Sequence, residues 1–418
     1  MTLPDSLIEK VFFWASLCPY VVYFAGLGPV APFLLAWPVI LLALILHLRD
    51  GLRPPTLALI WCLSGVCMLA EQLITLYQRG VGMNQVPWWF MTYALGAFLP
   101  LAGGLIRPAV VSTAAALLGV QSLLYVGAAL VATAAGVIHL VEYKSIIPSS
   151  LLGAQDLFKV HFFPPDYQFD HEWRLVAFTP YTPFAGAVAI IFSMITLTEK
   201  STWLKWTGFA GWFSLMLCTH SRMGLVAMTT CVAIFALNSL GRRYFTMALG
   251  VVLLGAAVLA GPLLHYSEKA TSLVHSARLN SSQDRENLRS IAFDNWRYGD
   301  HQILGAGESV QGGQIVNQVY IGDLDSLGAM LFLRGAVGFG LTVLPILLTW
   351  VYGFSGGSHP LYRGVLCIAT AMMFYSYSQS LKVLFMYFWP VFVFLGAVAY
   401  RDRARALQPV PQPALLTS

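Results

Sequence analysis

The stretch that decides the fold is residues 29–48, which read PVAPFLLAWPVILLALILHL. These 20 residues contain no Asp, Glu, Lys or Arg, and Arg49 and Asp50 follow at once. A helix needs about 20 mostly apolar residues to cross the hydrocarbon core of a membrane. The stretch therefore predicts a transmembrane helix.

The composition of the whole chain extends this prediction. Of its 418 residues, 57% are hydrophobic and only 10% are charged, whereas soluble chains are roughly 25% charged. The mean hydropathy is +0.69, and the 36 Gly, 22 Pro and 12 Trp are residues that membrane spans use freely. This excludes a cytosolic enzyme, collagen, a coiled coil and a disordered chain. The fold class we predict is an all-α polytopic membrane protein, with 1–418 as one integral-membrane domain.

The same rule, applied along the chain, predicts twelve transmembrane helices. Tight connections make helical hairpins of 11–48 and 205–240. The remaining polar mass lies in two long segments, 132–182 and 265–325, and in a tail, 401–418. The predicted spans are 11–27, 29–48, 56–78, 88–106, 108–131, 183–198, 205–220, 223–240, 244–264, 326–352, 364–380 and 383–400.

The distribution of Lys and Arg predicts the orientation. Positive residues concentrate in cytoplasmic turns. With both termini in the cytoplasm, those turns carry eleven positive residues against three acidic ones, and both long segments lie outside. The eleven are Arg49, Arg53, Arg107, Lys200, Lys205, Arg242, Arg243, Arg363, Arg401, Arg403 and Arg405.

The two long segments are predicted to be ordered and functional, since loops above about 15 residues are uncommon unless they have a role. In 265–325, apolar residues such as Leu288, Ile291 and Ala292 recur at helical spacing with Trp296, so an amphipathic helix is expected there. The first segment ends in the aromatic and acidic run 166–174.

Six cysteines lie in apolar runs, which favours buried thiols over disulfides or a metal cluster. Seven of the nine histidines fall on the predicted outer side, but none has the spacing of metal ligands. We therefore expect no metal. A single His or carboxylate remains a candidate general base. The first ten residues lack the basic region and cleavage site of a signal peptide, so the first span is expected to be retained.

A few charges lie in or beside apolar runs. Arg222 is at the mouth of a hairpin, and Arg334 is about 13 Å below the predicted outer surface at 1.5 Å per helical residue. Lys382 is in the last outer turn, and Glu71 is an acid well inside a span. Arginine at the centre of a span costs about 2.5–3.5 kcal/mol. Snorkelling to the interface is one interpretation for all three cations. For Arg334 the depth favours a bound or internal anion, and a phosphate suits a guanidinium.

Four blocks of sequence follow one another around these charges. Three of them combine charged residues with glycines that precede or enter a span. The blocks are Arg174-Leu175-Val176-Ala177-Phe178 with Pro180 and Pro183, Ser221-Arg222-Met223-Gly224-Leu225, Arg285, Arg289 and Trp296 with Gly305-Ala306-Gly307, and Asp325-Ser326-Leu327 through Gly335-Ala336-Val337-Gly338.

In these blocks, over roughly 170–340, the chain resembles the O-antigen ligase and Wzy-type polysaccharide polymerase superfamily of bacterial inner membranes. Ligases of that family commonly have a His near the start of the last block, where this chain has Asp325. That departure looks more like the polymerase branch and leaves the general base open. Gly305-Ala306-Gly307 lacks the third glycine and the lysine of nucleotide-binding loops, so a tight turn beside the site is expected instead.

The resemblance implies a GT-C-like helical bundle in the bacterial inner membrane with its active site facing the periplasm. It implies a metal-independent glycosyltransferase without a cofactor, acting on an undecaprenyl-diphosphate-linked oligosaccharide. Membrane lipid is a further expected partner, a chain-length regulator and a flippase are candidate protein partners, and nucleic acid is not expected.

Our hypothesis for the site assigns the donor diphosphate to arginines. Arg222 binds it with one or both of Arg285 and Arg289, Arg174 closes from the first long segment, and Arg334 lies beneath. The proton acceptor is Asp325, with His301 and Glu172 as the next candidates. Fixed guanidinium groups would stabilise the charge of the leaving group.

Each assignment has a structural alternative. Asp325 could cap the tenth span or pair with Arg334. Arg285 and Arg289 could pair with acids of their own helix, and Trp296 could be a core residue of the loop. The competing functions are an O-antigen ligase that transfers glycan to lipid A core, a twelve-span secondary transporter, and a scaffold or sensor without chemistry.

Overall fold

The structure is a computed structural model, and it describes residues 2–79, 86–136, 143–144, 146, 159–160, 174–179, 182–241, 279–307, 310–311, 320–321, 327–378 and 386–406. The predicted span 244–264 lies outside these residues. The elements are α1 (Leu7–Leu17), α2 (Pro19–Val22), η1 (Tyr23–Leu27), η2 (Gly28–Val30), α3 (Ala31–Asp50), α4 (Thr56–Arg79), α5 (Val86–Ala102), η4 (Gly103–Leu105), α6 (Pro108–Ala134), β1 (Tyr143–Lys144), β2 (Lys159–Val160), α7 (Thr182–Thr196), α8 (Thr202–Cys218), α9 (Arg222–Ser239), α12 (Leu279–Tyr298), β3 (Val310–Gln311), β4 (Tyr320–Ile321), α13 (Leu327–Ser355), α14 (Pro360–Ser378) and α16 (Trp389–Ala406).

The helical character of the chain is confirmed, and each predicted span other than 244–264 contains a helix. In the described part of the chain, four helices are long and apolar enough to cross a membrane by themselves, and the bent pair of α1 with α2 and η1 adds a fifth if the pair crosses as one span. The four are Ala31–Asp50, Thr56–Thr75, Pro108–Ala134 and Gly328–Ser355. The protein is therefore a helical membrane protein.

The first predicted span, 11–27, is not one straight helix. α1 ends at Leu17, and the chain then turns by 53° into Pro19–Leu27. Pro19 is the first residue of α2 and has no backbone N–H to continue the ladder from α1. Gly26, with φ 75°, breaks the π-helical turn η1 in the same segment.

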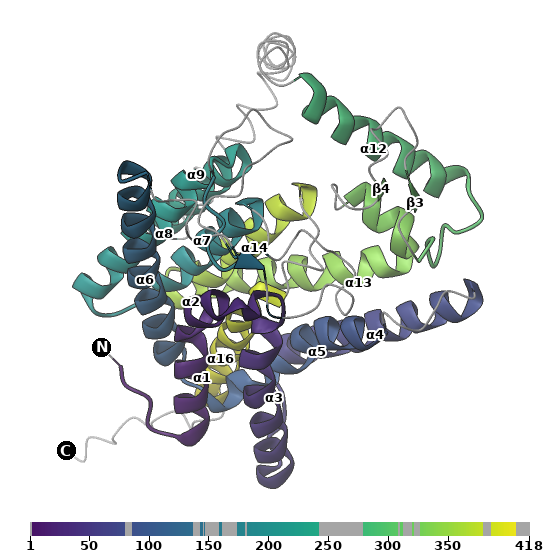
Figure 1. The fold of residues 1–418 in the computed structure, drawn as a ribbon. Helices are drawn as coiled ribbons and strands as arrows, with labels where there is room; N and C mark the ends of the chain where they lie inside the picture. The colour runs from purple at the N-terminus through teal and green to yellow at the C-terminus, as the bar shows by residue number, and fades with distance from the viewer. Residues whose placement is uncertain are drawn as a thin grey trace, which may run out of the picture.

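Helix α7 is the centre of the bundle. Every residue of its 15 except Pro183 is buried, and α6, α8, α9, α14 and α16 all pack against it. Figure 1 shows it among these helices. Because other helices surround it, α7 has no lipid-facing stripe and can be shorter than an isolated span.

Close packing of α6 on α8 depends on glycine. A Cβ on Gly119 would lie 2.3 Å from the carbonyl oxygen of Gly208, and one on Gly211 would lie 1.8 Å from that of Gly119. Small residues let helix backbones approach in this way in membranes. The indole N–H of Trp212 then reaches the Ala115 carbonyl oxygen across the interface, at 3.0 Å.

The predicted amphipathic helix of the second long segment is confirmed as α12. Its buried residues Leu288 and Ala292 form a small cluster with Ala306, Ile321 and Phe332, so α12 packs on the first part of α13. In Figure 1, α12 lies over α13 with β3 and β4 between them. The two-stranded pairs β1–β2 and β3–β4 are antiparallel.

Basic turns that are far apart in sequence meet at one end of the bundle. Arg403, at the end of α16, donates to the carbonyl oxygens of Arg53 and Pro54 at 3.1 and 2.9 Å. Arg107, between α5 and α6, forms an ion pair with Glu9 of α1 at 2.7 Å. These contacts join the α3–α4 turn to the end of α16, and the α5–α6 turn to the start of the chain.

The long segments contact the other end. Ile146 donates to the carbonyl oxygen of Gly26, at the far end of the α1–α3 hairpin, at 3.0 Å. Gln72, near the end of α4, donates to Gly307 at 3.3 Å. The described pieces of 132–182 and 265–325 therefore lie at the end of their helices opposite to the basic turns.

Candidate functional site

Residues 219–221 join α8 to α9, and we call this turn, with Arg222 directly after it, the α8–α9 mouth. α8 ends at Cys218, and α9 begins at Arg222 with Ser221 as its N-cap, because the Ser221 hydroxyl accepts from the Gly224 N–H at 3.1 Å. The backbone of Arg222 is thus fixed by the cap. Its side chain lies outside the described residues.

Segment 174–179 packs directly against this mouth. The Leu175 N–H donates to the Cys218 carbonyl oxygen at 3.0 Å, and Arg174 is 8% exposed. The sequence predicted that Arg174 and Arg222 act on one ligand. The structure brings their two chain segments together, because only three residues separate Cys218 from Arg222.

Two unusual backbone conformations occur at the same mouth. In the part of the chain that the structure describes, the non-glycine residues with positive φ are Ala177, at 54°, and His220, at 51°. Strained conformations of this kind persist where the surrounding structure imposes them, and they cluster at functional sites. His220 is exposed, so its imidazole is accessible beside Ser221 and Arg222.

A tyrosine of α14 forms the floor of the mouth. Tyr375 is fully buried, and a Cβ on Gly186 of α7 or on Gly224 of α9 would lie 3.3 or 3.2 Å from its hydroxyl oxygen. Helices α7, α9 and α14 thus approach closely at the level of Ser221.

Arg334 occupies a second place in the fold, between α4, α5 and α13. Its Nη1 donates to Oε2 of Glu71 at 2.8 Å, and the two side chains are 12% and 2% exposed. Its Cζ lies 4.9 Å from the ring centroid of Tyr93. The internal anion that the depth of Arg334 favoured is therefore a carboxylate of α4. The alternative partner, Asp325, lies outside the described residues.

Glu71 is itself held by its own helix. The Thr75 hydroxyl lies 3.2 Å from Oε1 of Glu71 and 3.3 Å from the Leu304 carbonyl oxygen. The neighbouring Gln72 is 1% exposed, and its amide oxygen has no hydrogen-bond partner in the described part of the chain. A buried acceptor left without a donor costs about 1–3 kcal/mol, so this oxygen is suited to a donor from water or a ligand.

Helix α13 is broken next to Arg334. Gly335 has φ 61° and ψ −170°, which interrupts the helix. The turn 302–307 then bonds to both halves: the N–H groups of Ala306 and Gly307 donate to Phe332 and Leu333 at 2.6 and 2.8 Å, while Gln302 accepts from Ala336 at 2.8 Å. The backbone groups freed by the break are satisfied by protein, as the interior of a membrane requires.

The glycines singled out in the sequence interlock at this break. A Cβ on Gly305 would lie 2.3 Å from the Arg334 nitrogen, and one on Gly335 would lie 2.2 Å from the Ile303 carbonyl oxygen. Gly305 and Gly307 have φ of 68° and 80°, so the predicted tight turn is confirmed.

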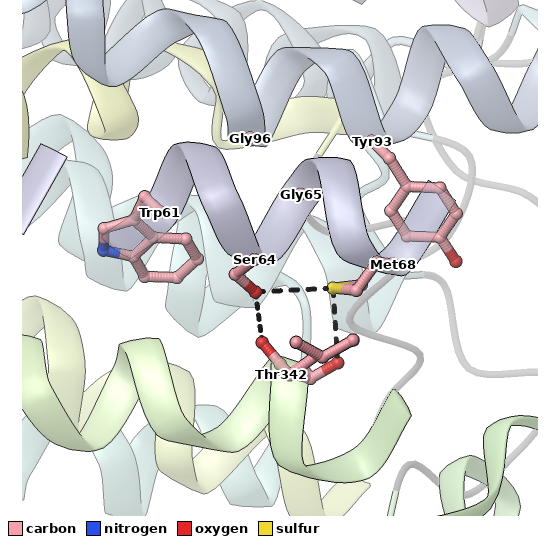
Figure 2. A pocket seen from close by; sticks show the side chains of 8 residues that line it. Trp61, Ser64, Gly65, Met68, Tyr93, Gly96 and Thr342 are labelled. Carbon is pink, nitrogen blue, oxygen red and sulfur yellow. Dashed lines mark hydrogen bonds between the residues drawn. The ribbon is translucent and has the colours of Figure 1, made fainter. Parts of the chain in front are cut away.

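A small, mostly apolar pocket adjoins the ion pair through Tyr93. Figure 2 shows that Trp61 and Met68 of α4, Tyr93 and Gly96 of α5, and Thr342 of α13 surround it. The hydroxyls of Ser64 and Thr342 lie 3.8 and 3.7 Å from the Met68 sulfur. This lining packs α4, α5 and α13 together below Arg334.

The other predicted site residues divide into two groups. His301 is exposed directly before the turn 302–307, which bonds to α13, and Arg289 is half-buried on α12, which packs on α13. Both residues therefore lie in the part of the fold that contains Arg334. Trp296 is half-buried and donates to the Gln302 carbonyl oxygen at 2.9 Å, so its indole N–H joins α12 to the turn that follows. Asp325, Glu172, Lys382 and the side chain of Arg285 lie outside the described residues.

The sequence did not predict that Glu71 is part of the site. The available signal was the presence of one acid and one arginine, each inside an apolar run. Such charges usually pair with each other or line a wet cavity. Comparison of the chain with protein-family models and with curated proteins gives no match.

Proposed function

We propose that the protein is a polymerase of an O-antigen, capsular or exopolysaccharide, which transfers undecaprenyl-diphosphate-linked glycan to a sugar hydroxyl at the periplasmic leaflet. The observation that carries this proposal is the junction of 174–179 with the α8–α9 mouth, where Leu175 bonds to Cys218. Two segments that contain arginine, 174–179 and the start of α9, thus meet at the end of the bundle opposite to the basic turns.

In this proposal the arginines bind and stabilise the diphosphate. Arg222 holds it with one or both of Arg285 and Arg289, Arg174 closes over it, and Arg334 contributes charge from below. The acceptor hydroxyl attacks the anomeric carbon, the bond from that carbon to the phosphate oxygen breaks, and the lipid diphosphate leaves with the electron pair. The hydroxyl proton goes to Asp325, His301 or Glu172. Arginine suits this task because its planar fork matches phosphate oxygens.

The proposed topology has twelve spans, with both termini and the tail 401–418 in the cytoplasm and the long segments in the periplasm of a bacterial inner membrane. The contacts of Arg403 with 53–54 and of Arg107 with Glu9 support it, because they place basic turns at one common end. Positive residues flank spans on the cytoplasmic side.

A secondary transporter is the second candidate, and the break in α13 favours it. Carriers bind substrate at discontinuous helices near the membrane centre. In this protein, however, the backbone groups at the break are occupied by the turn 302–307. The break therefore presents little free backbone to a transported substrate.

The test is the length of lipid-linked glycan made by membranes that contain Arg222→Ala at wild-type protein level. We expect synthesis to fall at least 10-fold, since one preorganised donor at a developing charge is worth roughly 100- to 1,000-fold. The matched control is Arg49→Ala, a 70% exposed residue of the basic end, which should retain synthesis. Wild-type chain length in Arg222→Ala would contradict the proposal. Glycan on lipid A core would identify a ligase instead, and glycan movement without lengthening a transporter.

A further inference from the structure

The ion pair between Arg334 and Glu71 links two parts of the candidate site that are distant in sequence. Glu71 lies on α4, 263 residues before Arg334, and its carboxylate is 2% exposed while Arg334 is 12% exposed. The Glu71 carboxylate is therefore closed off, while the Arg334 side chain keeps a small exposed fraction. A carboxylate so placed acts on a ligand only through its partner.

The direction of the Arg334 side chain is fixed on two sides. Glu71 holds Nη1 at 2.8 Å, and the ring of Tyr93 lies 4.9 Å from Cζ. A Cβ on Gly338 would lie 2.4 Å from the Cβ of Arg334 and 3.4 Å from Oε2 of Glu71, so only glycine fits where the pair forms. A cation held this way needs little reorganisation when charge develops nearby.

The same turn of α4 also holds the outer segment. Thr75 approaches both Glu71 and the Leu304 carbonyl oxygen, at 3.2 and 3.3 Å, and Gln72 donates to Gly307 at 3.3 Å. The turn 302–307 in turn bonds to both halves of the broken α13. One stretch of α4, residues 71–75, thus determines where Arg334 and the turn 302–307 lie relative to each other.

We propose that Glu71 is a positioning residue for the transfer reaction: its carboxylate orients the guanidinium of Arg334 and, together with Gln72 and Thr75, registers the turn 302–307 against α13. The inference rests on the proposed function and deepens it. The resemblance locates the site residues within 170–340, whereas this inference adds a residue of the transmembrane helix α4 that positions them. Its consequence is kinetic. A displacement of about 1 Å in a positioned group can lower a rate by about 100-fold.

The experiment compares Glu71→Gln and Glu71→Asp with Glu9→Gln in the full-length protein, reconstituted in vesicles and supplied with lipid-diphosphate-linked repeat units. Glu9 is the matched control, because it is also a buried carboxylate, 3% exposed, that pairs with an arginine at 2.7 Å, but at the basic end. Thermal unfolding of each variant is measured beside kcat and KM for the donor.

We expect Glu71→Gln to lower kcat at least 10-fold with a smaller change in KM. Glu9→Gln should unfold at a temperature similar to that of Glu71→Gln but keep its kcat within twofold of wild type. Glu71→Asp preserves the charge but is one carbon–carbon bond, about 1.5 Å, shorter. It should restore the unfolding temperature without restoring kcat, and it serves as the test if Glu71→Gln does not fold.

Two results would overturn the inference and leave the proposed function in place, and a third would overturn both. If both Glu71 variants keep the kcat of Glu9→Gln while wild type is active, Glu71 has no positioning role and the proposed function stands. A loss of activity that only follows the loss of folded protein, and that Glu71→Asp recovers in full, assigns the pair to stability alone. An inactive wild type would instead refute the proposed function, and the positioning role with it.

Discussion

His220 has a left-handed backbone at a position where helices usually place glycine. It follows the C-cap Thr219 of α8, has φ 51°, and donates to the Leu217 carbonyl oxygen at 3.1 Å. The left-handed region costs an L-residue such as alanine about 1–2 kcal/mol. Glycine avoids this cost but loses about 0.4–1 kcal/mol of stability, because its unfolded chain has more conformational entropy. We expect His220→Gly to be about 1 kcal/mol more stable than His220→Ala, measured by thermal unfolding in detergent. Equal stability of the two variants would show that the site relaxes.

At the residue scale, the sequence identified Arg334 as a cation inside an apolar run but did not identify its partner. Arg334 was recognisable from its depth in an apolar run, and an internal anion was one of the expected answers. That the anion is Glu71 depends on how α4 packs against α13, which no local pattern encodes. The N-cap role of Ser221 is a local feature of the structure, since a serine directly before a helical run needs no distant partner.

The break in α13 has a direct test in Gly335→Ala. Gly335 adopts φ 61° and ψ −170°, a region that is essentially restricted to glycine, and an added Cβ would lie 2.2 Å from the Ile303 carbonyl oxygen. We expect Gly335→Ala to lower stability by at least about 2 kcal/mol, as the strain alone costs about 1–3 kcal/mol. The measurement is the unfolding temperature of the purified protein.

Gly340 is the control within the same helix. A Cβ there meets nothing within 4 Å, and alanine is favoured over glycine inside a helix by about 0.5–1 kcal/mol. Gly340→Ala should therefore be neutral or stabilising. If the two variants unfold at the same temperature, the interlock with the turn 302–307 is not rigid.

At the element scale, hydropathy predicted where helices lie because a span must be apolar along its whole length. It did not predict the bend at Pro19 or the break at Gly335. Glycine and proline are both frequent in membrane helices, and Pro38 lies inside α3 without ending it, so neither residue indicates a break by itself. The break in α13 becomes favourable only because 302–307 satisfies the freed backbone groups, and those residues are distant in sequence.

At the scale of the whole molecule, the distribution of basic residues and the packing point to the same arrangement independently. The sequence predicted one basic face from charge counts alone. In the structure, His47 of α3 bonds to Tyr400 of α16 at 3.0 Å, and Thr113 of α6 bonds to Glu199 after α7 at 2.6 Å. These contacts join turns that the charge distribution assigns to one side, although the sequence could not indicate which turns touch.

Orientation in the membrane can be measured with single cysteines at two exposed positions. Lys200 follows α7 at the basic end, and Asp300 follows α12 in the second long segment. In intact spheroplasts, we expect a membrane-impermeant maleimide to label Asp300→Cys and to leave Lys200→Cys unlabelled until the membrane is permeabilised, because positive turns remain in the cytoplasm. The wild-type chain, with its six native thiols, gives the background to subtract. The opposite labelling would mean that the bundle has the inverse orientation. The α8–α9 mouth with Arg222 would then lie in the cytoplasm, where a periplasmic transfer reaction could not occur.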